Sequence, residues 1–81
     1  MINNIEEKVK DIIVTESYDE LPVDNDNFYD LDFRTQLLFD SLQIVEVAMS
    51  CEAKFGITLS EDDVLNAKTP NDLIKLIKEK L

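Results

Sequence analysis

The chain has 81 residues, which allow one small domain and leave little room for a deep catalytic cleft. Its 18 acidic and 8 basic residues give a net charge of −10, which argues against a nucleic-acid binder, because such proteins neutralise phosphates with Lys and Arg. The chain contains no histidine, which excludes Ser-His-Asp and Cys-His catalysis and any His-ligated metal site.

The first predicted element is an amphipathic helix over residues 4–17, where apolar residues recur at helical spacing. Asn3 or Asn4 is expected to cap its start. A long loop is expected next, because Pro22 and the Asp/Asn-rich residues 24–27 interrupt the helical pattern. Asp32 is expected to cap a short turn within the loop. The apolar residues expected to hold the loop to the core are Phe28, Leu31, Phe33 and Leu37.

Three further helices are predicted in the second half of the chain. The first covers residues 41–55 and ends at Gly56, where a left-handed residue is expected. A short helix follows over residues 60–67, opened by Ser60 and the three acidic residues behind it.

The last helix is expected to begin at Thr69 as its cap, with Pro70 in the first position, and to end near Lys80. The residues expected to face the core from this helix are Leu73, Ile74, Ile77 and Leu81. Together the elements predict an all-α fold: a small four-helix bundle with three longer helices, one short third helix and a long loop after the first helix.

Two apolar stripes run along the helix predicted over residues 41–55. With about 100° of rotation per residue, the first stripe contains Ile44, Val47, Ala48, Cys51 and Phe55, and the second contains Leu42, Val45 and Met49. Either the helix is buried on all sides, or one stripe faces the core and the other receives visiting proteins. We favour the second interpretation, because Glu46 lies beside the second stripe and a carboxylate indicates solvent.

Asp40 and Ser41 stand at the start of the same helix. Both are ordinary N-cap residues, so the pair alone indicates only a helix start. A serine hydroxyl there is also suited to hold a phosphoester, because free N–H groups and the helix dipole favour an anion. Since no lysine lies near Ser41 in the sequence, we do not expect it to be a catalytic nucleophile.

Three segments resemble the acyl carrier proteins: Phe-Asp-Ser-Leu at 39–42, Val-Glu-Val-Ala-Met at 45–49 and Phe-Gly-Ile at 55–57. The long first loop and the acidic third helix also resemble that family, so the resemblance covers residues 1–81 as a single acyl-carrier-like domain. It implies a carrier and not an enzyme, with 4′-phosphopantetheine esterified to Ser41 and acyl groups held as thioesters on its thiol.

The resemblance also implies partners. A phosphopantetheinyl transferase would deliver the arm from coenzyme A with the help of Asp40, and acyl-transferring and synthase enzymes would dock through basic patches. The expected partner-binding residues, which agree with the second stripe, are Leu42, Val45, Glu46 and Met49. The acyl chain is expected to be sheltered between the helices, against Val47, Cys51, Phe55 and Ile57.

The chain departs from the family pattern before and after the serine. Residues 36–39 are Gln-Leu-Leu-Phe where Asp-Leu-Gly is usual, so the approach to Ser41 is bulkier and more apolar, and Gln43 replaces a common acid. The resemblance implies partner enzymes of fatty-acid, polyketide or specialised lipid biosynthesis. The departures argue against the housekeeping fatty-acid carrier and favour a specialised carrier for a polyketide, a modified lipid or another dedicated pathway. Two alternatives stay open: an unmodified interaction module with this fold, and an aminoacyl or peptidyl carrier, although the Gly-Gly usual in that class is missing.

The protein is expected to be a monomer. The cytoplasm is the expected compartment, because a single cysteine cannot form an internal disulfide and fits a reducing environment. The first residues lack the features of a signal peptide, and no stretch approaches the roughly 18 apolar residues that span a bilayer. No metal site is expected, because the Asp/Asn-rich segment fails as a calcium loop: Tyr29 and Thr35 stand where glycine and glutamate are required.

Overall fold

The computed structural model describes residues 5–18 and 20–81. These residues form four α-helices, one short 3₁₀ helix and no strand, which confirms the expected all-α fold. In chain order the elements are α1 (Ile5–Glu16), η1 (Phe28–Asp30), α2 (Ser41–Phe55), α3 (Glu61–Asn66) and α4 (Pro70–Lys80).

The predicted helix boundaries are confirmed where local capping signals set them. Ser60 Oγ accepts the N–H of Asp63 at 3.1 Å, and Thr69 Oγ1 accepts that of Asp72 at 3.2 Å. Gly56 ends α2 with φ 67° and ψ 39°, the left-handed conformation that glycine adopts without steric cost. The cap expected at Asn3 or Asn4 lies outside the described residues.

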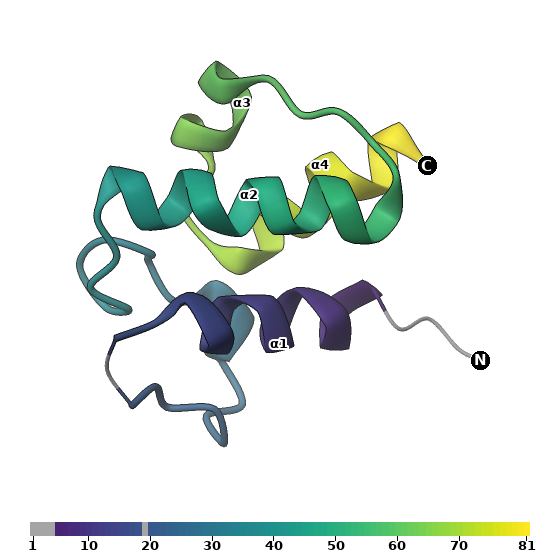
Figure 1. Ribbon diagram of the computed structural model, residues 1–81. Helices are drawn as coiled ribbons and strands as arrows, with labels where there is room; N and C mark the ends of the chain where they lie inside the picture. Colours follow the sequence, from purple (N-terminus) through teal and green to yellow (C-terminus); the bar gives the residue numbers. More distant parts are fainter. Residues whose placement is uncertain (1–4, 19) are drawn as a thin grey trace.

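Helix α2 crosses the middle of the bundle, with α1 on one side and α3 on the other (Figure 1). Helix α1 also contacts α4, and η1 packs on α4. The long loop between α1 and α2 lies at the end of the molecule where α2 begins (Figure 1). The loop therefore determines how the chain enters α2 at Ser41.

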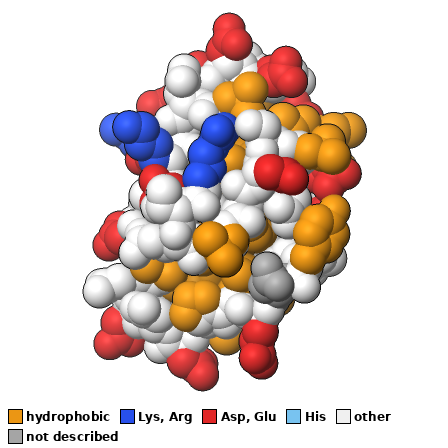
Figure 2. Space-filling model, turned by 90° about the vertical axis from the view of Figure 1, so that its left-hand side faces the viewer, with side chains coloured by type: hydrophobic (Ala, Val, Ile, Leu, Met, Phe, Trp, Pro, Cys, Tyr) orange, Lys and Arg blue, Asp and Glu red, His pale blue; other side chains and the backbone are white. Residues whose placement is uncertain are grey.

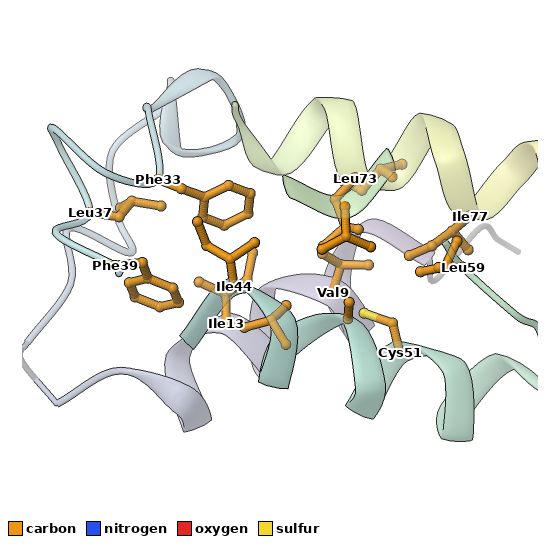
Figure 3. Close-up of a cluster of buried hydrophobic side chains, with 14 of the residues drawn as sticks. Val9, Ile13, Phe33, Leu37, Phe39, Ile44, Cys51, Leu59, Leu73 and Ile77 are labelled. Atoms are coloured by element: carbon orange, nitrogen blue, oxygen red, sulfur yellow. The ribbon is translucent and has the colours of Figure 1, made fainter. Parts of the chain in front are cut away.

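One core joins the helices to this loop (Figure 3). The ring centroids of Phe33 and Phe39 lie 5.8 Å apart, and both rings are buried beside the first turn of α2. The helices contribute aliphatic side chains, among them Val9, Ile13, Ile44, Leu73 and Ile77.

The expected anchors of the loop are also confirmed. Phe28, Phe33 and Leu37 are buried and Leu31 is half-buried. Asp32 Oδ1 accepts the backbone N–H groups of residues 34 and 35, at 2.8 and 2.9 Å, and so caps the turn as expected. Helix η1 was not predicted, because three residues are too few for a helical period to show.

The prediction that Leu81 faces the core is wrong. Its side chain is 63% exposed. Helix α4 ends at Lys80, so the helical spacing that turns Leu73, Ile74 and Ile77 toward the core does not extend to Leu81.

Candidate functional site

Ser41 is the first residue of α2, and its side chain is exposed at the end of the molecule formed by the long loop. The N–H groups of a first helical turn have no partner within the helix, and the helix dipole adds positive potential there. Because α2 is 15 residues long, this hydroxyl stands at the start of a full-length helix. The position is therefore suited to hold a negatively charged phosphoester.

Asp40 caps α2 through a reciprocal pair of hydrogen bonds with Gln43. The Gln43 backbone N–H donates to Asp40 Oδ1 at 2.8 Å, and the Asp40 N–H donates to Gln43 Oε1 at 3.1 Å. This capping box fixes the direction of the chain through Ser41. The capping box was not predicted, although an N-cap residue followed three positions later by Gln is its sequence signal.

Gln43 also connects α2 to the end of α1. Its Nε2 donates to the carbonyl oxygen of Glu16 at 3.3 Å, and Ser50 Oγ donates to Glu16 Oε2 at 3.4 Å. The Gln43 side chain is only 5% exposed, the one buried polar side chain among the described residues. A glutamate could accept from Asp40 but could not donate to Glu16, so the amide suits this position.

Leu38 precedes the site in an uncommon backbone conformation. Its φ is 62°, which is left-handed and strained for a residue with a branched side chain. It stands where the acyl carrier pattern has glycine, and its side chain is 65% exposed. The expectation that the approach to Ser41 is bulkier and more apolar agrees with this exposure.

The two stripes of α2 differ in burial as expected. Ile44, Val47, Ala48 and Cys51 of the first stripe are buried, whereas Leu42 and Met49 of the second are 64% and 61% exposed. Val45 and Glu46 are half-buried. The alternative that α2 is buried on all sides is therefore wrong.

Hydrophobic and acidic side chains are interspersed over the end of the molecule that carries the loop and the start of α2 (Figure 2). Few basic side chains are visible on this face. Within residues 11–53, eleven acidic residues stand against Arg34 as the one base. The surface around the second stripe is therefore suited to a partner with a basic rim.

A pocket of about 170 Å³ opens between α2 and α3. Its lining residues are Val45, Ala48, Met49, Glu52, Leu59, Glu61 and Val64. The volume is close to that of a cavity of about 150 Å³ that holds one benzene molecule, or six carbon atoms. The pocket shares none of the four residues expected to shelter an acyl chain, because Val47 and Cys51 are fully buried in the core and Phe55 and Ile57 pack against it.

Cys51 is part of the core, as expected. Burial, with a smaller contribution from the charge of Glu52, raises the pKa of its thiol to about 12. The thiol is therefore protonated at neutral pH and is no nucleophile. Among residues 5–18 and 20–81, no group of three or more acidic or cysteine side chains is arranged to hold a metal ion.

The comparison with known protein families agrees with this geometry. Residues 7–77 match the profile of the phosphopantetheine attachment site family. The match defines the class of protein: a helical domain that bears a covalent phosphopantetheine group. None of the helices in the described part of the chain is both long and apolar enough to traverse a bilayer.

Individual relatives narrow the class. The chain is 40% identical over 76 residues to an acyl carrier protein of Petrotoga mobilis, covering 93% of this chain and 85% of that protein. It is 38% identical over 78 residues to an acyl carrier protein of Chlamydia trachomatis serovar D, covering 95% of this chain and 96% of the relative.

A solved structure is also similar: the solution structure of the acetyl actinorhodin acyl carrier protein from Streptomyces coelicolor. It superimposes with a TM-score of 0.77 at 25% identity, over 93% of this chain and 87% of the other. The chain therefore belongs to the acyl carrier protein family, and its prosthetic group is 4′-phosphopantetheine. Membership implies interaction with transferase and synthase enzymes.

Proposed function

We propose that Ser41 is the residue to which 4′-phosphopantetheine is attached, and that the chain holds acyl intermediates as thioesters on that group. The observation that supports this most strongly is the exposed hydroxyl at the first position of α2. First-turn N–H groups and the helix dipole favour the phosphodiester charge at this point. The group supplies a thiol on a flexible arm, and the chain supplies the anchor and the surface that partners recognise.

Asp40 has two roles in this proposal. Its carboxylate is held by the N–H of Gln43 at 2.8 Å, which fixes the backbone at the start of α2, where Ser41 stands. The residue is nevertheless exposed, so the same carboxylate can meet a basic group of the phosphopantetheinyl transferase.

Partner enzymes are proposed to dock on the second stripe of α2. Leu42 and Met49 offer exposed apolar surface, and Glu46 provides a carboxylate beside it. An apolar centre with an acidic rim fits enzymes whose docking patches are basic around an apolar depression. The proposed docking residues are Leu42, Val45, Glu46 and Met49.

The pocket between α2 and α3 is the proposed shelter for a short acyl chain. Its wall is held in place because the Leu59 N–H donates to Glu52 Oε2 at 2.7 Å. Each methylene transferred from water to such a site contributes about 0.8 kcal/mol. A volume of about 170 Å³ favours chains of about six carbons over long ones.

The pathway is proposed to be a specialised branch of fatty-acid, polyketide or lipid biosynthesis. Support comes from Leu38 and Gln43, which replace residues usual in the family at the approach to the serine. The chain is proposed to serve other enzymes as a cofactor-bearing substrate and not to be an enzyme, because it has no histidine and its one thiol is buried and protonated.

We further propose that residues 1–81 act as a single domain and as a monomer. The cytoplasm is the proposed compartment, since a carrier's terminal thiol has to stay reduced to accept acyl groups. Size-exclusion chromatography with light scattering tests the monomer directly.

The function is tested by intact-mass measurement after incubation with coenzyme A and a phosphopantetheinyl transferase. The protein is expected to gain the mass of one phosphopantetheine arm and then to accept an acyl group. Hydroxylamine, which cleaves thioesters, should release that acyl group. A protein that folds but gains no arm would instead be the unmodified interaction module.

The docking surface is tested with Met49→Ala and Glu46→Lys, and with Phe33→Ala as a core control. The first two are expected to slow partner reactions with little change in melting temperature, because Met49 is exposed, Glu46 is only half-buried and neither belongs to the core. Phe33→Ala, at 1% exposure, is expected to cost about 3–5 kcal/mol of stability. A melting temperature as low for Met49→Ala as for Phe33→Ala would mean that the second stripe is core.

A further inference from the structure

Leu38 is the one residue other than glycine with a positive φ among the described residues. An L-residue with a bulky side chain pays a steric penalty in this conformation, and glycine is the usual occupant. Such strain persists only where something outweighs it, and it gathers at functional sites.

The fold requires the turn at residue 38 but not the leucine. The flanking residues Leu37 and Phe39 are both buried, and their N–H groups donate to the carbonyls of Asp32 at 2.9 Å and Phe33 at 2.7 Å. These anchors on both sides force the backbone between them into the left-handed region. The Leu38 side chain is 65% exposed and is not part of the core cluster, so a glycine would satisfy the same turn with less strain.

We propose that Leu38 is a specificity-determining contact for the phosphopantetheinyl transferase that modifies Ser41. This inference rests on the proposed function. The transferase has to cover the segment just before Ser41 in order to reach its hydroxyl, and Leu38 lies three residues away with its side chain in solvent.

The chemistry of the transferase surface follows from what surrounds Leu38. Leu42, the second residue of α2, adds a second exposed apolar side chain at 64%. Acidic residues are interspersed with hydrophobic ones on this end of the molecule (Figure 2). The partner is therefore expected to offer an apolar pocket for Leu38 inside a basic rim.

Three variants of Leu38 separate the apolar contact from the backbone strain. Leu38→Gly removes both the side chain and the strain. Leu38→Asn keeps a side chain that tolerates the left-handed region but makes it polar, and Leu38→Met keeps an apolar side chain of similar size. The measurement is kcat/KM for arm transfer from coenzyme A, with the transferase encoded in the same genome and Ser41 intact in every variant.

We expect kcat/KM to fall about tenfold for Leu38→Gly and Leu38→Asn, the loss that corresponds to one leucine left out of an apolar pocket. Leu38→Met is expected to stay within about twofold of the wild type. The melting temperature of Leu38→Gly is expected to be unchanged or higher, because strain is relieved. This combination cannot arise from a leucine that only packs the loop.

Equal kcat/KM for wild type, Leu38→Gly and Leu38→Asn would overturn the inference and leave the proposed function intact. A wild type that accepts no arm would overturn both. If sedimentation shows a dimer that Leu38→Gly abolishes, while arm transfer is unchanged, the side chain serves a contact between two copies and the transferase assignment is wrong.

Discussion

Gln43→Ala is expected to destabilise the start of α2 because the side-chain amide of Gln43 makes two hydrogen bonds in a buried place. Oε1 accepts the Asp40 N–H at 3.1 Å, and Nε2 donates to the Glu16 carbonyl at 3.3 Å. Each such bond contributes about 0.5–1.5 kcal/mol, and a buried partner left unpaired costs about 1–3 kcal/mol. The bond from the residue 43 backbone to Asp40 survives, and alanine is a strong helix former, so the net loss should be about 2 kcal/mol.

Thermal melting measures this loss. About 1 kcal/mol shifts the melting temperature of a domain of 60–100 residues by about 4–8 °C, so a decrease of about 8–16 °C is expected. Gln36→Ala is the matched control, because Gln36 Oε1 accepts the Asp32 N–H at 2.8 Å in an exposed place. That variant should lose less than about 1 kcal/mol.

Gln43→Glu separates the two bonds. The carboxylate can still accept from Asp40 but cannot donate to Glu16, and it adds a negative charge near Asp40. Because that charge is buried and faces the Glu16 carbonyl with no donor between them, the melting temperature at neutral pH is expected to be no higher than that of Gln43→Ala. The reasoning is refuted if Gln43→Ala melts at the same temperature as Gln36→Ala, because the buried amide would then contribute no more than an exposed one.

Two further predictions concern charge. Burial raises the pKa of Cys51 to about 12, so above pH 9.0 the thiol loses its proton in the unfolded chain before it does in the folded one, and the free energy of unfolding should fall as pH rises. Urea titrations at several pH values check this, and an equal dependence of that free energy on pH in wild type and Cys51→Ala would contradict it. Sodium chloride or millimolar magnesium should raise the melting temperature, because the eleven acidic residues within 11–53 repel one another, and should weaken transferase binding, because the same residues attract basic partners. A melting temperature that changes with neither salt would refute the repulsion.

The features that sequence predicted correctly are those set by neighbours along the chain. The capping signals at Ser60 and Thr69 and the glycine at 56 fix helix ends through contacts three or four residues away. The rotation of about 100° per residue predicted the two stripes of α2, and the exposed side chains of Leu42 and Met49 confirm the second one. Local geometry of this kind needs no knowledge of the rest of the fold.

The features that sequence missed depend on tertiary packing or on a helix end. The left-handed backbone at Leu38 arises because both of its neighbours are buried. A leucine disfavours this conformation, so the residue itself gives no sequence signal for it. The pocket between α2 and α3 depends on how the loop through Leu59 packs. Leu81 was expected to be buried because the helical phase was extended one residue past the end of α4.

Locating the added group is the most direct test of the central claim that Ser41 bears the arm. Trypsin cleaves after Arg34 and Lys54, which places Ser41 and Ser50 in one peptide. After incubation with coenzyme A and transferase, fragment ions are expected to place the arm on Ser41. Ser50→Ala should then be modified fully, and Ser41→Ala should stay unmodified while losing at most about 1 kcal/mol of stability, because Asp40 still caps the helix. An arm found on Ser50, or gained by folded Ser41→Ala, would contradict the account.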